Sequence, residues 1–469
     1  MSTFSALNTA TLALYAQQRA IDVTGQNIAN VNTEGYSRQR VDMQSIGGNT
    51  VPAIWSVSNQ VGQGVNADQV TRIRDAFLEA RAQTEHATTA SLTVQSDTLS
   101  QIEQSFQEPG STGIQSMLTN MWSGWSDIHN NPTDPGARSQ LLQRTQTLVA
   151  GLHTVAASLD GQWTNTQDSL NTLMTDVNSS AAQVANLNQA IKRATESNMP
   201  TNELQDKRDV LILHLADTVG ATSIKQSDGT LSVSVGGTTL VSGNAALKLK
   251  LTGAPSSATA TSNPVRIVTD PAGTPMSVGG TAQGQLSALT SIIPRYQGQL
   301  DGIAQQLAAQ ANAGHAAGYD LNGNPGKPMF GQTPVTAPSL TAANITMLIT
   351  DPSELAAAAV SPTAAGGVIS GDGGNADAMF QMRLTTNGVD ATYRKMIVAS
   401  GVETATASGN LTTQTVVSTN VDSARDSVAG VSTDEEMTNM LQFQHGYQAA
   451  GKLVETINSM LDDLMAMVN

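Results

Sequence analysis

Cysteine is absent from the 469-residue chain, and aromatic residues make up only 3% of it. Without cysteine there can be no disulfide scaffold, no thiol nucleophile and no metal site that needs thiolate ligands. The absence also fits a chain that must pass unfolded through a narrow channel, because a disulfide would lock a loop. The low aromatic content argues against an enzyme pocket, whose walls are usually rich in aromatic side chains.

Charged residues are also scarce, at 13% of the chain. The 23 basic and 38 acidic residues leave a net charge of −15. An acidic chain is poorly suited to the phosphate backbone, so we expect no nucleic-acid partner. Ser, Thr, Asn and Gln carry the polarity instead, which suits long helical surfaces packed side by side.

Long apolar runs are missing as well. No stretch reaches the ~20 apolar residues of a membrane span. The first eleven residues have neither the basic start nor the apolar run of a secretory signal. We therefore expect no membrane insertion and no cleaved signal peptide.

Apolar residues recur with a seven-residue period at both ends of the chain. The N-terminal positions are Leu7, Leu14, Ile21 and Ile28. The C-terminal positions, in steps of three and four, are Met440, Phe443, Tyr447, Ala450, Val454, Ile457, Leu461, Leu464 and Val468. Such spacing directs one face of a helix toward one partner helix and favours a coiled coil over an amphipathic helix on a globular core. Ser432 and Thr433, each three residues before Glu435 and Glu436, offer two overlapping capping boxes at the start of the C-terminal helix.

The interior pattern predicts further helices and a short β region. Helices are expected over 75–106, 135–200, 203–219 and 284–312, with a possible break in the second near Gly151 or Gly161. Alternating residues predict strands over 222–225, 231–235, 239–241, 247–251 and 265–268. The dipeptides Asp228-Gly229 and Gly236-Gly237 are typical of hairpin turns.

Together these patterns predict a mainly α protein with a β insertion. Its parts are an elongated helical bundle, a terminal coiled-coil domain formed by both chain ends, and a small antiparallel β domain. The predicted domains are 1–72 with 425–469 for the coiled coil, 73–219 with 280–424 for the bundle, and 220–279 for the β domain.

Chemical motifs are weak throughout. The run from Gly446 to Lys452 resembles a phosphate-binding loop, but Leu453 replaces its Ser or Thr, and a helix surrounds it. The stretch Asp320–Asn324 starts like a calcium loop, but Pro325 stands where that loop needs glycine, so a turn is the better interpretation. No two of the six histidines are spaced for zinc on a helix. Sequence alone leaves open a Ser/His/Asp grouping brought together by the fold. We predict no catalytic residue, no cofactor and no metal, and hence no enzyme; Trp122 and Trp125 should pack in the bundle.

Two end motifs carry a family resemblance. Residues 27–40 read NIANVNTEGYSRQR, which resembles the N-terminal signature of bacterial flagellar axial proteins, and its hook-associated members in particular. Residues 430–450, with Asp434, Glu435 and Glu436 near their start, resemble the C-terminal signature of the same family. Interior stretches agree at 62–78, 202–209 and 312–330. The sequence departs from the family pattern at His445, Gly446 and Gly451.

The resemblance implies a structural protein at the junction between the flagellar hook and filament, exported unfolded by the flagellar type III apparatus. Implied partners are further copies of the chain in a helical junction layer, the hook protein, a second junction protein (hook-associated protein 3) and a flagellar export chaperone. The implied N-terminal assembly residues are Leu7, Leu14, Ile21, Asn27, Ile28, Asn30, Asn32, Gly35 and Tyr36. We call the four N-terminal and nine C-terminal apolar positions given above the N-terminal seam and the C-terminal seam. The C-terminal seam is the implied surface for assembly or for the chaperone. We expect both seams to become buried only in the assembled layer.

Two alternatives stay open. One is another flagellar axial protein, such as a hook or rod subunit. The other is an extracellular adhesin, or an enzyme acting on peptidoglycan, with a coiled-coil stalk.

Overall fold

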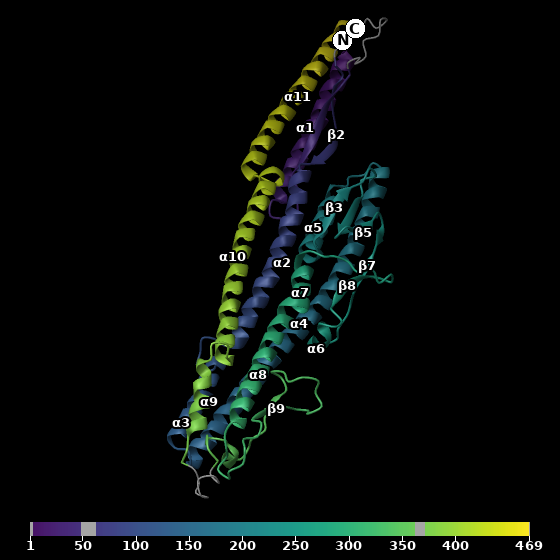
Figure 1. The fold of residues 1–469 in the computed structure, drawn as a ribbon. Helices are drawn as coiled ribbons and strands as arrows, with labels where there is room; N and C mark the ends of the chain where they lie inside the picture. The colour runs from purple at the N-terminus through teal and green to yellow at the C-terminus, as the bar shows by residue number, and fades with distance from the viewer. Residues whose placement is uncertain (1–2, 48–61, 362–370, 469) are drawn as a thin grey trace. The chain divides into compact units, whose positions relative to one another are not determined.

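A computed structural model of the chain describes residues 3–47, 62–361 and 371–468 (Figure 1). The chain forms two compact units. Unit 1 comprises Met1–Ala87, Asn178–Leu247 and Thr415–Asn469, and unit 2 comprises Thr88–Val177 and Lys248–Gln414. Three helices contribute residues to both units: α2 (Ala76–Phe106), α4 (Pro135–Glu196) and α10 (Val389–Ala429).

Unit 1 contains both ends of the chain. Its helices α1 (Thr3–Ala29) and α11 (Thr433–Val468) lie side by side, as Figure 1 shows in purple and yellow. An antiparallel hairpin of β1 (Gln39–Ile46) and β2 (Gly64–Arg72) also contacts α1. The packing of the two chain ends confirms that part of the fold prediction. The hairpin was not predicted, and it lies within the segment assigned to the coiled coil.

The remainder of unit 1 is a helix followed by a small sheet. The elements are α5 (Asn202–Val219), β3 (Ala221–Lys225), β4 (Leu231–Val235), β5 (Thr238–Ser242) and β6 (Ala245–Ala246). The strands pair antiparallel in sequence order. Gly220 ends α5 with a φ of 71°, and Gly236 and Gly237 turn the chain between β4 and β5 with φ values of 53° and 83°. Only glycine adopts these positive φ angles readily, so the turn forms where the glycine pair predicted it.

Unit 2 is mainly helical. Its own elements are α3 (Ile114–Asn130), β7 (Lys248–Thr252), α6 (Ser257–Ala260), β8 (Arg266–Asp270), α7 (Gly280–Ser287), a π-helical turn (Ala288–Ile292), α8 (Ile293–Ala316), β9 (Phe330–Gln332), β10 (Ile345–Met347), α9 (Gly374–Gln381) and two 3₁₀ turns (Pro352–Glu354 and Met382–Leu384). The strands form two separate antiparallel pairs, β7 with β8 and β9 with β10.

Tryptophans form part of the core of unit 2. Trp122, Trp125 and Trp163 have no exposed surface, which confirms that the first two pack in the bundle. Trp122 Nε1 donates to Asp390 Oδ2 at 2.8 Å, and Trp163 Nε1 donates to the Leu289 carbonyl oxygen at 3.0 Å. The indole N–H groups of Trp122 and Trp163 are therefore buried with a partner, whereas that of Trp125 has none among the described residues.

Helix α4 runs for 62 residues without interruption, so the break near Gly151 or Gly161 does not occur. A Cβ at Gly151 would lie 2.4 Å from Met117 Sδ, so the glycine makes room for α3. Gly161 has no such neighbour. The helix predicted over 284–312 is a succession of α7, the π turn and α8 from Gly280 to Ala316.

The predicted fold class is confirmed, because the structure is mainly helical with small antiparallel sheets. Two differences are notable. Strands β3–β6 and the pair β7–β8 form separate sheets, and they belong to different units. Helices α3 and α10 were not predicted. The division into three domains stays a prediction.

Candidate assembly site

The N-terminal and C-terminal motifs meet at Asn27, near the end of α1. Asn27 Nδ2 donates to the Gln39 carbonyl oxygen at 2.8 Å and to Glu436 Oε2 at 3.0 Å. Asn27 Oδ1 accepts from the Gln39 N–H at 3.0 Å and from the Tyr36 hydroxyl at 2.9 Å. The side chain is 1% exposed, and both its donors and its acceptor sites are used. We call Asn27, Tyr36, Arg38, Gln39 and Glu436 the terminal clasp.

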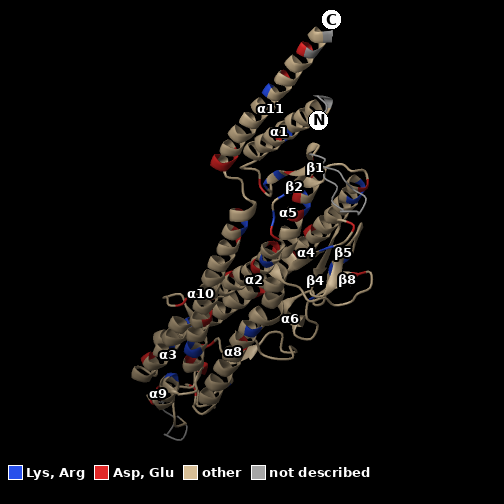
Figure 2. Cartoon of the chain, turned by 90° about the horizontal axis from the view of Figure 1, so that it is seen from above, with Lys and Arg blue, Asp and Glu red and all other residues tan. Residues whose placement is uncertain are grey.

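Glu436 is the C-terminal member of the terminal clasp. It is 2% exposed and lies in the acidic first turn of α11, which is red in Figure 2. Arg38 Nε donates to Glu436 Oε1 at 2.7 Å, and Arg38 Nη1 pairs with the exposed Glu435 at 2.9 Å. The Arg38 N–H also donates to the Ala429 carbonyl oxygen. Glu436, one of the two carboxylates that the sequence offers to a capping box, is therefore bound by Asn27 and Arg38 instead.

Tyr36 keeps its proton in this setting. Burial raises the pKa of Tyr36 to about 12, with further contributions from the negative charges of Asp206 and Glu436. The hydroxyl can therefore donate to Asn27 at any physiological pH, which fixes the loop after α1 against the helix.

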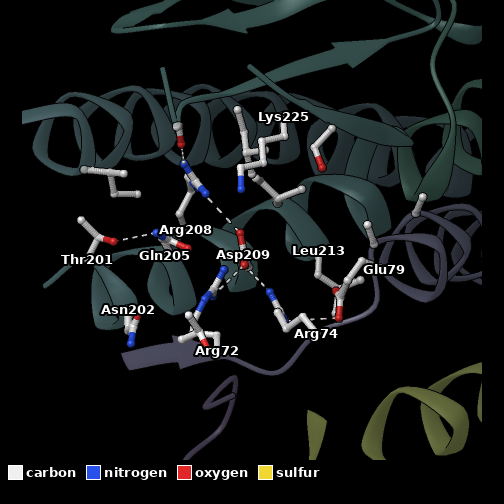
Figure 3. A pocket seen from close by; sticks show the side chains of 18 of the residues that line it. Arg72, Arg74, Glu79, Thr201, Asn202, Gln205, Arg208, Asp209, Leu213 and Lys225 are labelled. Carbon is white, nitrogen blue, oxygen red and sulfur yellow. Dashed lines mark hydrogen bonds and ion pairs between the residues drawn. The ribbon is translucent and has the colours of Figure 1, made fainter. Parts of the chain in front are cut away.

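A second polar cluster ties the same loop to α5. Ser37 Oγ donates to Asp206 Oδ1 at 2.7 Å. Arg72 Nη1 donates to that oxygen at 2.6 Å and to Asp209 Oδ2 at 3.0 Å. Arg74 also pairs with Asp209 (Figure 3). The motif stretches around residues 37, 72 and 206, far apart in sequence, thus converge in unit 1.

Arginines of this cluster line a cavity of about 630 Å³ in unit 1 (Figure 3). Arg208, which is 3% exposed, donates to Asn188 Oδ1 at 3.1 Å and to the Gly229 carbonyl oxygen at 3.2 Å. Its burial lowers the pKa of its guanidinium. Arg72 and Arg74 each face carboxylates. Since these guanidinium groups already have partners, the cluster is suited to hold the fold together.

A third cluster joins α2, α5 and the C-terminal part of α10. His86 Nδ1 lies 3.1 Å from Asp217 Oδ1, and His86 Nε2 lies 3.0 Å from Asp422 Oδ2. Arg425 bridges Asp422 and Glu79, with both contacts at 3.1 Å. The hydrogen bond to Asp217 is the main reason that the pKa of His86 is raised. Only the protonated ring can donate to both carboxylates at once.

The predicted N-terminal seam is only half-buried. Leu7, Leu14, Ile21 and Ile28 all have intermediate exposure. The buried positions of α1 are Ala10, Ala16, Ala20, Val23, Thr24 and Asn27. Because α1 contacts both α11 and the β1–β2 hairpin, its small residues are buried and its larger seam residues lie at the margin.

The loop residues in the predicted assembly set differ in exposure. Asn30 is half-buried and Asn32 is exposed. Gly35 has a φ of 76°, and a Cβ there would lie 2.2 Å from Val210 Cγ2. Glycine is therefore required at position 35 both by the backbone and by the approach to α5.

The predicted C-terminal seam faces α1 within a single chain. Ala450 and Ile457 are buried. The half-buried seam positions are Met440, Phe443, Val454 and Leu461; Tyr447 is 42% exposed, and the side chains of Leu464 and Val468 lie outside the described residues. A Cβ at Gly446 would lie 2.9 Å from Gln17 Cδ, which shows how closely the helices approach. Two positions of the C-terminal seam are therefore already buried within one chain, whereas the N-terminal seam is not fully buried there. Their contact with another copy or a chaperone stays a prediction.

Helix α11 also carries a second row of large apolar residues that stays exposed in the single chain. Leu453, Met460 and Met467, spaced seven apart, are 49%, 53% and 83% exposed. We call these three residues the outer row. Exposed apolar residues repeated along one helix face are typical of an interaction surface.

The chemical motifs of the sequence are structural in the fold. Residues 446–453 are continuous helix, and Lys452 Nζ pairs with the exposed Glu455 at 2.7 Å. Asp320 Oδ1 accepts from the N–H groups of Asn322 and Asn324, both at 2.8 Å, which is the expected turn. Over the part of the chain that the structure describes, no cluster of three or more His, Asp or Glu residues could hold a metal. Within the same residues, no helix is long and apolar enough to cross a membrane.

Sequence reasoning missed most of the residues that join these segments. Arg38, Asp206, Asp209 and Glu436 lie in the quoted motifs but were not predicted as site residues. The sequence did contain a signal for these residues. Charged residues are scarce in the chain, yet several of them lie inside its motifs. Their partners lie too far away in sequence to be read from spacing.

Family comparisons cover the two ends and the middle of the chain. The family model for the flagellar hook-associated protein FlgK helical domain matches residues 99–330. The flagella basal body rod protein model matches residues 7–36, and the flagellar basal body rod FlgEFG protein C-terminal model matches residues 424–467. The two rod-type matches cover most of the segments that form α1 and α11.

Individual relatives extend over nearly the whole chain. Flagellar hook-associated protein 1 of Bacillus subtilis is 29% identical over 99% of this chain and 98% of its own length. The Escherichia coli protein of the same name is 25% identical over 98% of this chain and 99% of its own length. The structure of the flagellar hook junction protein FlgK from Burkholderia pseudomallei superposes with a TM-score of 0.63 at 19% identity, covering 76% of this chain and all of that one. The last comparison shows a shared fold.

Proposed function

The chain belongs to the flagellar hook-associated protein 1 family, and we propose that its paired terminal helices build the junction between hook and filament. It is a structural component of the flagellum and not an enzyme. Its site of action lies outside the cell, at the hook–filament junction.

The observation that carries the proposal is the difference between the two apolar rows of α11. We call the C-terminal seam of α11 the inner row. Its residues Ala450 and Ile457 are buried, whereas Leu453, Met460 and Met467 of the outer row are exposed. Apolar side chains left at the surface can gain about 25 cal/mol per Å² when a partner covers them. The outer row is therefore available to helices of neighbouring copies in a stacked layer.

The terminal clasp supports assembly because it holds α11, and with it the outer row, in a fixed position relative to the loop after α1. It fixes the start of α11 to the loop after α1 through Asn27, Arg38 and Glu436. A heterologous contact that repeats from copy to copy builds an open or ring-shaped layer, and such a layer needs each copy to hold the same orientation of its helices. Pre-organised helices also reduce the ordering cost of assembly.

The partners proposed for the chain are those of a junction layer. They are further copies of the chain, the hook protein on one side and hook-associated protein 3 on the other. Before assembly, a flagellar export chaperone would cover the outer row, and the type III apparatus would export the chain. The family supports flagellar assembly partners in general, and the outer row is the surface we assign to them.

Electron microscopy of a deletion strain tests the proposal. Cells that lack the chain should carry hooks without filaments and should shed flagellin into the medium. Expression of the intact chain should restore the filaments, and expression of an exported chain truncated before α11 should not. Filaments attached to hooks in the deletion strain would contradict the proposal.

A further inference from the structure

A partly apolar hollow of about 750 Å³ lies in unit 1, between the loop after α1 and the helices α4 and α5. Tyr36, Leu187, Val210 and Leu211 provide its apolar lining. Val210 is still 37% exposed, although Gly35 packs against it. The hollow therefore offers apolar surface that the chain itself leaves uncovered.

Two carboxylates at the hollow define what it can accept. Glu34 and Glu203 line it, both are exposed, and neither has an ion pair with another described residue. A third acid in the lining, Asp206, already binds Ser37 and Arg72. The basic residue Lys207 also lines the hollow, so Glu34, Glu203 and Lys207 together carry a net negative charge. An occupant should be apolar in its body, with a hydroxyl or a positive charge at its end.

The outer face of α1 carries a side-chain pair with this chemistry. Tyr15 is 66% exposed in a chain that has only six tyrosines. Arg19 follows it one helical turn later, is exposed, and forms no ion pair within the described ranges. A tyrosine has an apolar ring that fits an apolar floor and a hydroxyl that needs an acceptor when buried. Tyrosine and arginine are also the residues most enriched among those that dominate interface energies.

We infer that Tyr15 of one copy inserts into the hollow of a second copy, with its hydroxyl and Arg19 facing Glu34 and Glu203. This contact rests on the junction role proposed above and specifies one surface that joins neighbouring copies. The two surfaces are different patches of the same chain, so the contact is heterologous and can repeat around a layer. Phe77, which is 70% exposed, is a less suitable occupant because it has no polar end to meet the carboxylates.

Because the chain has no cysteine, a thiol-specific cross-linker can react only with cysteines that are introduced into it. Gln18→Cys places a thiol beside Tyr15, and Lys207→Cys places one at the hollow; both positions are exposed, and Tyr15 itself is unchanged. Flagella carrying the double variant are treated with a short bismaleimide, and the products are separated by denaturing electrophoresis. A heterologous contact should give a ladder of multimers, whereas a mixture of the two single variants should give dimers only.

Two controls make the experiment decisive. Pairing Gln18→Cys with Ile224→Cys, at a residue 65% exposed elsewhere in unit 1, should give no ladder. Adding Tyr15→Phe to the Gln18/Lys207 variant should weaken the ladder, and adding Tyr15→Ala should abolish it. A ladder that survives Tyr15→Ala overturns the assignment of Tyr15. A ladder that is lost with Phe77→Ala while Tyr15 is intact overturns it as well.

The same experiment separates this inference from the proposed function. Flagella that retain filaments but give no ladder contradict the Tyr15 contact and leave the junction role intact. Filaments that remain attached in cells lacking the chain contradict the junction role itself.

Discussion

Asn27 and Glu436 lie 409 positions apart in the chain and are joined by a hydrogen bond of 3.0 Å. Both side chains are almost completely buried, at 1% and 2% exposure. This bond and the Arg38–Glu436 ion pair connect the two sequence motifs by which the family is recognised. The motifs are therefore two halves of one structural feature.

The first prediction concerns the carboxylate of Glu436. Glu436→Ala should lower the free energy of unfolding by about 2–3 kcal/mol, because it removes hydrogen bonds to a charged group and leaves Asn27 unsatisfied. Glu435→Ala is the matched control in the same turn. Glu435 is 62% exposed, so its loss should cost less than about 1 kcal/mol. Urea unfolding of both variants provides the measurement, and equal effects would contradict the clasp.

Glycine substitutions in unit 1 should have opposite signs. A Cβ at Gly451 has no neighbour within 4 Å, and the residue lies inside α11. Gly451→Ala should therefore raise the free energy of unfolding by up to about 1 kcal/mol. Gly35→Ala should lower it, because position 35 has a positive φ and a Cβ there would overlap Val210. Thermal unfolding of the two variants checks the signs, and destabilisation by both would argue against the described path of α11.

A third prediction concerns pH. The folded-state pKa of His86 is raised above its ordinary value of 6.5, mainly by the hydrogen bond to Asp217. Protonated His86 therefore contributes its full stabilisation below about pH 6.5, and that contribution is lost as the pH rises through the folded-state pKa. The stability difference between the wild type and His86→Gln should be larger at about pH 6 than at about pH 9. His445→Gln, on the exposed surface of α11, is the control, because an exposed substitution should change the free energy of unfolding by less than about 0.5 kcal/mol. A difference that grows with pH would contradict the arrangement.

The inner row of α11 can be tested in the isolated chain. Leu461 is half-buried, so Leu461→Asp should weaken the α1–α11 contact by about 2 kcal/mol, since a carboxylate is costly to bury. Amide exchange in α1 should then become roughly 30-fold faster. Lys452→Ala is the control, because Lys452 is 81% exposed and, among the described residues, its ion pair is with Glu455 on the same helix. Unchanged exchange in α1 of the Leu461→Asp variant would show that α1 does not depend on this seam.

Regular patterns in the sequence were enough to predict part of this fold. The three-and-four spacing from Met440 to Leu461 predicted α11, and the glycine pair at 236 and 237 predicted the turn between β4 and β5. These elements are specified by residues close together in sequence. Helix α10 was missed because it is rich in Thr and Ser and has no sustained apolar spacing.

The assembly site was less predictable for a physical reason. Burial along α1 is set by two neighbours, α11 and the β1–β2 hairpin, so the buried positions include Ala10, Ala16 and Ala20 and not Leu14 or Ile21. The role of Glu436 depends on Asn27 and Arg38, which no local pattern connects to it. For Glu436 a capping box with Thr433 was one local interpretation, and its carboxylate is bound by the distant Asn27 and Arg38 instead.

The most direct test of the account is the attachment of filaments in cells whose only copy of the chain carries Met460→Asp. Met460 is 53% exposed and lies in the outer row, so the variant should fold, and detection of the chain outside the cell separates a failure of assembly from a failure of export. A carboxylate there should prevent neighbouring copies from covering the row, because it would be buried in the layer without a partner. The account predicts hooks without filaments for Met460→Asp and normal filaments for the exposed control Lys452→Ala, with both chains detected outside the cell. Normal filaments on Met460→Asp cells would contradict the claim that α11 assembles the junction through its outer row.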